Sequence, residues 1–200
     1  MTFTIQLYPV QLIDVIRLAD GRSITLRPSL PQDAEQLRAF FRTLSDKARY
    51  FRFMTTLREL PEALAKRFAG VDYRSHMALL AEHFDGDRGT IIGETRYIEN
   101  QDDPGTCEFA IAVADDWQGL GLARTLLDRL VSHAAASSIR QMVADTMCAN
   151  KAMIELARKA GFSIEPHRGH STLAPEQGSD GQRLPNECFR SPARARELKL

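Results

Sequence analysis

The stretch Ala114–Leu130, ADDWQGLGLARTLLDRL, places two glycines one residue apart between an apolar run and a helical pattern. The preceding residues 107–115, CEFAIAVAD, alternate like a strand. Behind the glycines, apolar side chains recur at helical spacing, at Leu122, Leu126, Leu127, Leu130, Val131 and Ala134. A strand that ends in a glycine turn and opens a helix presents unpaired backbone N–H groups and the positive end of the helix dipole. The pattern therefore indicates an anion site at Gly119–Gly121.

Other phosphate-binding motifs fit this turn poorly. The segment GLGLART, 119–125, lacks the GxxxxGK[ST] spacing of a nucleoside-triphosphate loop, and no lysine follows it. A dinucleotide fingerprint would need a glycine at Arg124 and usually lies in the first strand–helix unit of a parallel sheet. On spacing alone, a glycine turn that only reverses the chain stays open as an alternative.

Composition limits the class of protein. A chain of 200 residues with 44% hydrophobic content predicts one domain. Basic and acidic residues number 26 each, so nothing supports non-specific binding to nucleic acid or to an anionic membrane. The first 21 residues lack a basic n-region and contain Asp14 and Arg17, which predicts neither a signal peptide nor a membrane span, and a cytoplasmic location. Cys107, Cys148 and Cys188 are interpreted as reduced packing residues.

The remaining elements follow from hydrophobic periodicity and turn signals. Strand patterns lie at 23–29, 76–84, 90–100, 107–115, 140–147 and 162–166, and helical patterns at 31–44, 45–53, 60–70, 122–134 and 150–162. The three strands between residues 76 and 115 are expected to be antiparallel neighbours, and the strand–turn–helix–strand unit after them to be parallel. From His167 the composition becomes rich in Gly, Ser, Pro and Gln, which predicts a polar tail over 167–200, partly disordered or with an edge strand at CFRS, 188–191.

A resemblance to a known family agrees with these features. The segment QGLGLA, 118–123, resembles the Q/R-x-x-G-x-G/A signature of GNAT-type N-acetyltransferases, and NKAMIELARKAGF, 150–162, is similar to their N-x-x-A-x(6)-G-F pattern. Four segments further resemble the catalytic domain of Pat-type protein lysine acetyltransferases, namely 8–28, 44–54, 71–82 and 108–127. The resemblance implies an α/β (α+β) GNAT fold over 1–166, with 1–22 as an N-terminal extension. Its sheet is expected to be mixed, mostly antiparallel and six- to seven-stranded, with about four flanking helices.

The same resemblance implies a binding site for acetyl-CoA and no metal. The residues it assigns to the cosubstrate are Val113, Gln118, Gly119, Leu120, Gly121, Leu122, Ala123, Arg124 and Asn150. Among them, the glycine turn is expected to seat the pyrophosphate, and a backbone N–H near Val113 to polarise the thioester carbonyl. Partners are then acetyl-CoA and an amine acceptor, without nucleic acid or membrane, and a homodimer is compatible with the family.

Glu108 is the candidate catalytic residue. Period-2 alternation places it on one strand face with Ala110, Ala112 and Ala114, where poor hydration is expected to raise the pKa of a carboxylate and suit it to take a proton from an amine. Pairing of Glu108 with Arg96 is an equal alternative from the residues alone. The resemblance implies that Glu108 is the general base. Many GNAT enzymes have a tyrosine general acid where this chain has Ala157, so the acid is left open.

Several other residues have a structural and a functional interpretation. His76 is expected to be a partly buried structural histidine or to tune the choice of acceptor, and Arg96 to form a salt bridge or a substrate contact. His167 and His170 are expected to lie in an exposed loop rather than to form a metal site. A covalent acetyl-cysteine at Cys148 is disfavoured because no cysteine–histidine signature accompanies it.

Three functions remain to be separated from the sequence. An acetyltransferase acting on protein lysine is favoured by the Pat-like segments. A small-molecule amine acetyltransferase, acting on a polyamine, amino acid or antibiotic, fits the same catalytic core. A non-catalytic acyl-CoA-binding regulatory module is the third. The first two differ in whether the acetyl group ends on protein or on a small molecule.

Overall fold

The computed structural model describes residues 8–167 and 170–175, which form one mixed sheet with helices on both faces. The strand order is β1-β2-β3-β4-β5-β6-β8-β7, and among the described residues only β5 and β6 pair in parallel. The strands are β1 Asp14–Arg17, β2 Ser23–Pro28, β3 His76–Asp85, β4 Arg88–Glu99, β5 Thr106–Val113, β6 Gln141–Met147, β7 Phe162–His167 and β8 His170–Pro175.

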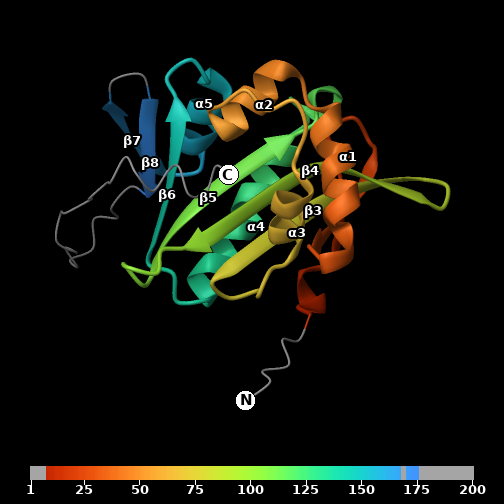
Figure 1. Cartoon of the computed structure of the whole chain (residues 1–200), viewed down its shortest axis with the longest axis horizontal. Helices are drawn as coiled ribbons and strands as arrows, with labels where there is room; N and C mark the ends of the chain where they lie inside the picture. Colours follow the sequence, from red (N-terminus) through yellow and green to blue (C-terminus); the bar gives the residue numbers. More distant parts are fainter. Residues whose placement is uncertain (1–7, 168–169, 176–200) are drawn as a thin grey trace.

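Helices pack on both faces of the sheet (Figure 1). The α-helices are α1 Ala34–Thr43, α2 Asp46–Phe53, α3 Glu62–Ala69, α4 Leu122–Ala136 and α5 Lys151–Lys159, and the short 3-10 turns are η1 Val10–Leu12, η2 Pro31–Asp33 and η3 Asp115–Trp117. One hydrophobic core joins α4 and α5 to the sheet, and the other joins α1, α2 and α3 to the opposite face. Helix α4 contributes its predicted apolar stripe to the first core, where Leu126, Leu127 and Leu130 are fully buried.

Strands β5 and β6 stay together for only three residue pairs. The parallel register runs from Thr106↔Gln141 to Glu108↔Val143, and beyond it β6 pairs with β8 instead. The half of β5 from Phe109 to Val113 therefore pairs with β4 on one side only. Strand separation leaves the other edge of β5 without a strand partner beyond Glu108, which makes a wedge-shaped opening in the middle of the sheet.

The expected mixed, mostly antiparallel GNAT fold is confirmed, with differences at both ends of the sheet. Eight strands and five α-helices are described, where six or seven strands and about four helices were expected. Strand β1 lies in the expected N-terminal extension, and β8 lies in the expected polar tail, between β6 and β7. The polar composition from 167 onward predicted a tail, but residues 170–175 form β8 because this strand pairs with β6 on one edge and with β7 on the other. The predicted strand at 188–191 lies outside the described residues. No helix in 8–167 or 170–175 is long and apolar enough to cross a membrane.

Gly93 fixes how closely the active-site helix approaches the sheet. A Cβ at this position would lie 3.2 Å from Leu126 Cδ1 and 3.4 Å from Leu122 Cδ2 of α4. We expect Gly93→Val to lower the free energy of unfolding by about 1–3 kcal/mol, because overpacking forces the helix outward. Urea denaturation measures this loss, with Gly93→Ala as the comparison, because a single Cβ requires Leu126 and Leu122 to move by only a few tenths of an ångström. A loss in Gly93→Val no larger than in Gly93→Ala would contradict this packing argument.

Candidate active site

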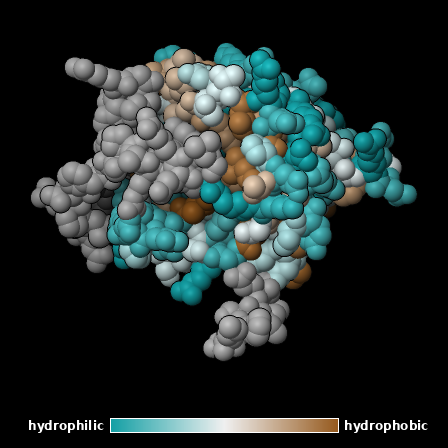
Figure 2. Space-filling model, viewed as in Figure 1, coloured by the Kyte–Doolittle hydropathy of each residue, from teal (hydrophilic) through white to brown (hydrophobic). Residues whose placement is uncertain are grey.

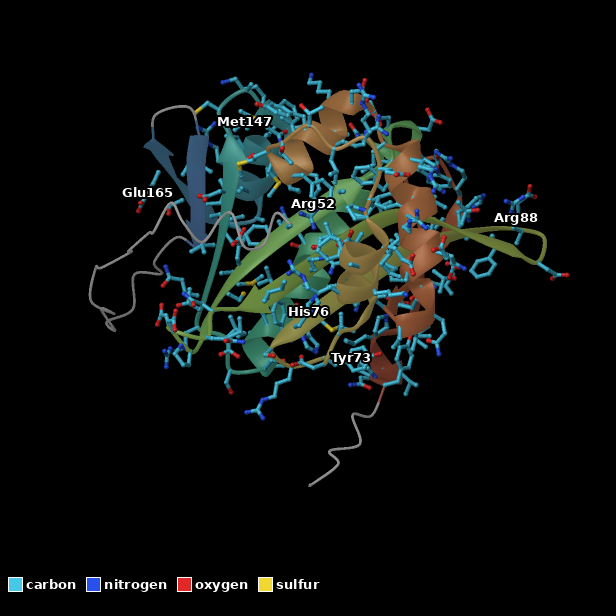
Figure 3. All side chains as sticks on the ribbon, viewed as in Figure 1. Arg52, Tyr73, His76, Arg88, Met147 and Glu165 are labelled. Carbon is cyan, nitrogen blue, oxygen red and sulfur yellow. The ribbon has the colours of Figure 1, made fainter. Side chains whose placement is uncertain are left out.

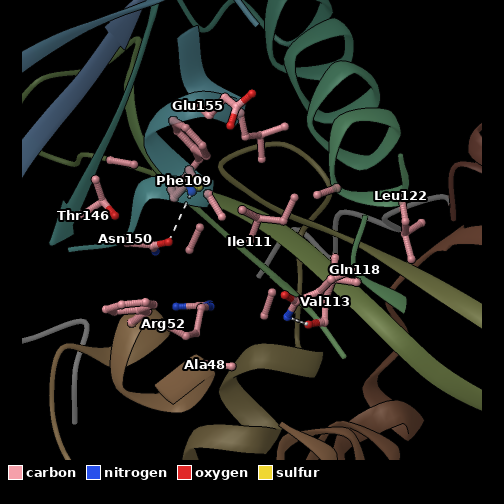
Figure 4. A pocket seen from close by; sticks show the side chains of 18 of the residues that line it. Ala48, Arg52, Phe109, Ile111, Val113, Gln118, Leu122, Thr146, Asn150 and Glu155 are labelled. Carbon is pink, nitrogen blue, oxygen red and sulfur yellow. Dashed lines mark hydrogen bonds between the residues drawn. The ribbon is translucent and has the colours of Figure 1, made fainter. Parts of the chain in front are cut away.

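A cavity of about 770 Å³ occupies the opening where β5 and β6 separate. Its walls come from β5, α2, the glycine turn, the start of α4, β6 and α5 (Figure 4). On the face that carries α2 and α3, apolar surface is visible near the centre and is bordered by hydrophilic surface (Figure 2). An apolar cavity with a few polar groups at its walls is the usual form of a small-molecule site.

The glycine turn has the geometry of an anion cradle. Gly119 and Gly121 have φ of 75° and 86°, a region that favours glycine, and a Cβ at either would meet nothing within 4 Å. Gly121 is the N-cap of α4, which has 15 residues, and no side chain caps its first N–H groups. Those N–H groups and the helix dipole are available to an anion approaching from the open side. Leu122 and Ala123 line the cavity as predicted, although the Leu122 side chain is buried in the core, whereas Leu120 packs against the core and does not line the cavity.

Val113 presents its backbone to the opening. The N–H of Ala114 donates to Ile92 O on β4 (2.9 Å), and N–H directions alternate along a strand, so the N–H of Val113 points away from β4. Gln118 Nε2 donates to Val113 O at 3.1 Å, which ties the end of β5 to the glycine turn (Figure 4). The predicted Val113 donor therefore lies at the wall of the cavity where β5 lacks a partner.

The α5 side of the cavity contains Asn150. Its Oδ1 caps α5 by accepting from Met153 N at 3.2 Å, which fixes the side chain beside the opening. Arg124 also lines the cavity, but its guanidinium donates to Asp128 (2.8 Å) and to Lys159 O (2.5 Å), so it also ties α4 to α5. Ala157 is fully buried in the core, and the residues that line the described cavity include no tyrosine.

Glu108 lines the cavity, but its environment differs from the expectation. The side chain is exposed, rather than in a poorly hydrated place, because β6 leaves β5 directly after the Glu108↔Val143 pair and opens this face. The alternative partner, Arg96, is held instead by Glu94 of the same strand. Glu108 therefore lies at the mouth of the opening, on the side of the sheet that faces α2 and α3.

A buried ionic cluster lies beside Glu108 on the same sheet face. Arg96 Nε donates to Glu94, Arg96 Nη1 donates to Phe68 O (3.0 Å), and Arg52 of α2 is 3.6 Å from Glu94. Burial alone would raise the pKa of Glu94, but the charges of Arg96 and Arg52 hold it below its ordinary value. Arg52, labelled in Figure 3, and Arg96 both line the cavity, so Arg96 forms a salt bridge and also lines the cavity.

His76 joins this cluster as a neutral group. Its Nε2 is 3.2 Å from Arg96 Nη1, and burial together with the Arg96 charge lowers its pKa to about 4. His76 is half-buried, which agrees with the interpretation of this residue as a structural histidine.

We expect this histidine to make the protein acid-sensitive. The unfolded chain takes up the proton near pH 6.5, whereas folded His76 resists it down to about pH 4, so stability is complete above pH 6.5 and falls as the pH drops. At pH 5 the loss is about 2 kcal/mol at 1.36 kcal/mol per pH unit. Urea denaturation at pH 7 and pH 5 measures it, and His76→Asn should show a correspondingly smaller loss. An equal loss in both proteins would contradict the assignment.

Cys107 and Cys148 do not line the cavity. Burial raises the pKa of the Cys107 thiol to about 12, which keeps it protonated. Cys148 Sγ is 3.5 Å from Ser171 Oγ and does not line the cavity, while Cys188 lies outside the described residues. His167 and His170 pair across the β7–β8 connection, and the described residues contain no group of three side chains able to hold a metal.

Sequence reasoning missed Arg52 and Glu94. Both belong to the cluster described above, but Arg52 lies between Phe51 and Phe53, and aromatic neighbours in a helix indicate packing rather than a binding site. A signal existed for Glu94, because period-2 alternation places it on the same face as Arg96, and the antiparallel register sets it opposite Ala112.

Comparisons with known proteins agree with this geometry. A family model described as "Acetyltransferase (GNAT) domain" matches residues 23–163. The chain is 38% identical over 146 residues to a protein named "Acetyltransferase PA5475" from Pseudomonas aeruginosa, covering 72% of this chain and 77% of that protein. It is 33% identical over 109 residues to the L-methionine sulfoximine/L-methionine sulfone acetyltransferase of the same species, covering 53% of this chain and 63% of that protein.

The crystal structure of the GNAT domain of S. lividans PAT is also similar, with 29% identity and a TM-score of 0.77. The match covers 84% of this chain and 98% of that domain, which agrees with the Pat-like segments of the sequence. The family model covers well over half of the chain and includes β5, the glycine turn and α5. The chain therefore belongs to the GNAT acetyltransferase family and is an acyltransferase of the type that uses acetyl-CoA.

Proposed function

We propose that the protein transfers the acetyl group of acetyl-CoA directly to a primary amine, with Glu108 as the general base. The single observation that carries this proposal is the separation of β5 from β6, which brings Glu108, Val113 and the glycine turn to one cavity. The pyrophosphate binds the N–H groups at the start of α4, and the thioester carbonyl oxygen accepts a hydrogen bond from the N–H of Val113. Lysines at the cavity wall, Lys47, Lys151 and Lys159, add positive charge for the phosphates.

The reaction is a nucleophilic acyl substitution. An amine with a pKa of about 10.4 is mostly protonated at neutral pH, so Glu108 takes its proton directly or through one water. The amine nitrogen attacks the thioester carbon, the developing oxyanion is stabilised by Val113 N–H, and the C–S bond then breaks. Coenzyme A leaves as a thiolate, and the second proton of the attacking nitrogen passes to it through water, since Ala157 stands in place of a tyrosine. Holding both reactants in one cavity supplies much of the acceleration.

The proposed acceptor is a protein lysine, since the domain with the TM-score of 0.77 belongs to a protein named PAT. A second candidate is a small amine. It is favoured by the 33% identity to a protein named as an acetyltransferase of methionine derivatives. We further propose that the protein is a cytoplasmic homodimer and that its catalytic domain runs past the expected boundary at 166 to Pro175, because β8 pairs inside the sheet.

One labelling experiment separates the two acceptors. The purified protein is incubated with radiolabelled acetyl-CoA and two pools of acceptor, one of proteins and lysine peptides and one of amino acids and polyamines. Label in the protein fraction supports the lysine acceptor, and label in the small-molecule fraction supports the second candidate. Binding of acetyl-CoA without label in either fraction and without release of free thiol would instead identify a non-catalytic binding module.

A further inference from the structure

We propose that Arg52 and Arg96 bind a carboxylate that the acyl acceptor carries beside its amine. The inference rests on the proposed function, because it names the acceptor chemistry of the same cavity. Both side chains line that cavity together with Glu108, and Figure 4 shows Arg52 at the cavity wall.

The first observation is a charge imbalance. Among the described residues, the guanidinium groups of Arg52 and Arg96 both pair with one carboxylate, that of Glu94, while Glu108 farther along the same face is exposed. His76 is neutral and so adds no charge above pH 5. The Asp72 carboxylate accepts hydrogen bonds within its own turn, from the backbone N–H groups of Arg74 and His76. A buried positive charge without a counter-ion is unfavourable, and an anionic ligand would neutralise it.

The second observation is a set of unused hydrogen-bond donors. Within the described residues, Nη2 of Arg96 and Nε of Arg52 are buried without a hydrogen-bond partner, and Nη2 of Arg52 has no hydrogen bond beyond its 3.6 Å ion-pair contact with Glu94. The side chain of Arg96 is only 3% exposed, so water does not satisfy this donor. A guanidinium presents N–H groups in pairs that match the two oxygens of a carboxylate. Those unsatisfied donors therefore suit a planar anion better than a neutral group.

The arginines are held in place before any ligand binds. Arg96 lies 3.9 Å from the centre of the Phe68 ring, and Arg52 lies 4.9 Å from the Phe53 ring. Helix α2, which carries Arg52, is tied to the end of β5 because Ser45 N and Oγ both donate to Asp115 at 2.8 Å. Side chains that are fixed in advance lose little entropy on binding, which is typical of a specificity site.

The position of the pair fits an acceptor with two functional groups. Arg96 lies opposite Ala110 in the β4–β5 register, two residues from Glu108 on the same face. Diagonal neighbours of this kind have Cα atoms roughly 7–8 Å apart. An amine at Glu108 and a carboxylate a few bonds away can therefore belong to one molecule. Its source is either the α-carboxylate of a free amino acid or an acidic side chain next to a peptide lysine.

The experiment compares matched acceptors that differ only in the carboxylate. One arm pairs free amino acids with their α-amides, and the other pairs a lysine peptide flanked by glutamate with the same peptide flanked by glutamine. Release of free thiol from acetyl-CoA gives kcat and KM for each. The wild-type protein should favour the carboxylate partner in one arm by about 10- to 100-fold in kcat/KM, as expected for hydrogen bonds between charged groups. The arm that shows the preference identifies the source.

The variants assign that preference to the arginines. Arg52→Gln should raise KM for the carboxylate acceptor by about 10-fold, and the preference in kcat/KM for the carboxylate acceptor over its neutral partner should fall by the same factor. The matched control is Arg49→Gln, one turn earlier in α2, because Arg49 pairs with Asp46 and does not line the cavity. Arg96→Gln serves as a second variant, with its Tm measured to verify folding.

Two results would overturn the inference. The first is turnover of both members of every pair at equal kcat/KM, and the second is a preference that persists in Arg52→Gln. An enzyme that accepts a carboxylate only on the acyl donor, as in succinyl-CoA, would give the first result. Failure of the proposed function is distinguishable, because it appears as no thiol release with any acceptor and overturns both proposals together.

Discussion

Glu108→Gln should lower kcat by about 100- to 10,000-fold and leave the binding of acetyl-CoA nearly unchanged. Glutamine keeps the size and exposure of the side chain but cannot take a proton from the amine, and a positioned general base contributes a factor of this order. The loss belongs to kcat because Glu108 lies at the mouth of the cavity on the acceptor side, away from the glycine turn. Thiol release at saturating acetyl-CoA measures it.

The pH profile separates a base from a structural side chain. Without Glu108, turnover depends on amine that is already deprotonated, so the residual rate should keep rising toward the amine pKa of about 10.4. The matched control is Glu165→Gln, an exposed glutamate on β7 that does not line the cavity. A Glu108→Gln protein with activity within threefold of the control would remove Glu108 from the mechanism.

Gly121→Asp should raise the KM for acetyl-CoA by about 100-fold or more. The new carboxylate would lie at the N-cap of α4 and accept hydrogen bonds from the N–H groups that are proposed to hold the pyrophosphate. Its negative charge would also repel the charge of the pyrophosphate. Two like charges about 4 Å apart repel by about 4 kcal/mol at an effective dielectric constant near 20, and 100-fold corresponds to about 2.7 kcal/mol. Initial rates at varied acetyl-CoA measure the change.

Backbone strain is controlled with a second glycine. Gly86, in the turn between β3 and β4, has φ of 59° and equally open surroundings, so Gly86→Asp introduces the same residue type at positive φ away from the cavity. The Gly86→Asp protein should keep the wild-type KM. Similar KM values in the Gly86 and Gly121 variants would mean that the glycine turn only reverses the chain.

Local patterns predicted the donor side of the site. The positive φ values of Gly119 and Gly121 are a requirement of the backbone, so the glycines themselves mark the turn. The apolar stripe of α4 and the alternation of β5 follow from the periods 3.6 and 2, and they place Glu108 and Val113 without any tertiary information.

The acceptor side depends on contacts that local patterns do not contain. The exposure of Glu108 follows from where β6 leaves β5, which depends on the pairing of β6 with β8. Strand β8 is polar in sequence and is stabilised by neighbours on both edges. Arg52 comes close to Glu94 only because Ser45 ties α2 to Asp115, 70 residues away in the sequence. Interactions across such separations are set by the whole fold.

Calorimetric titration of the wild-type protein with acetyl-CoA, and separately with NADH, tests the central claim most directly, because both ligands carry a pyrophosphate. The account predicts that acetyl-CoA binds at one site with a micromolar Kd, about −8 kcal/mol, and that NADH produces no binding heat. Absence of acetyl-CoA binding, or equal binding of both ligands, would contradict the assignment of the cavity between β5 and β6 as an acetyl-CoA site.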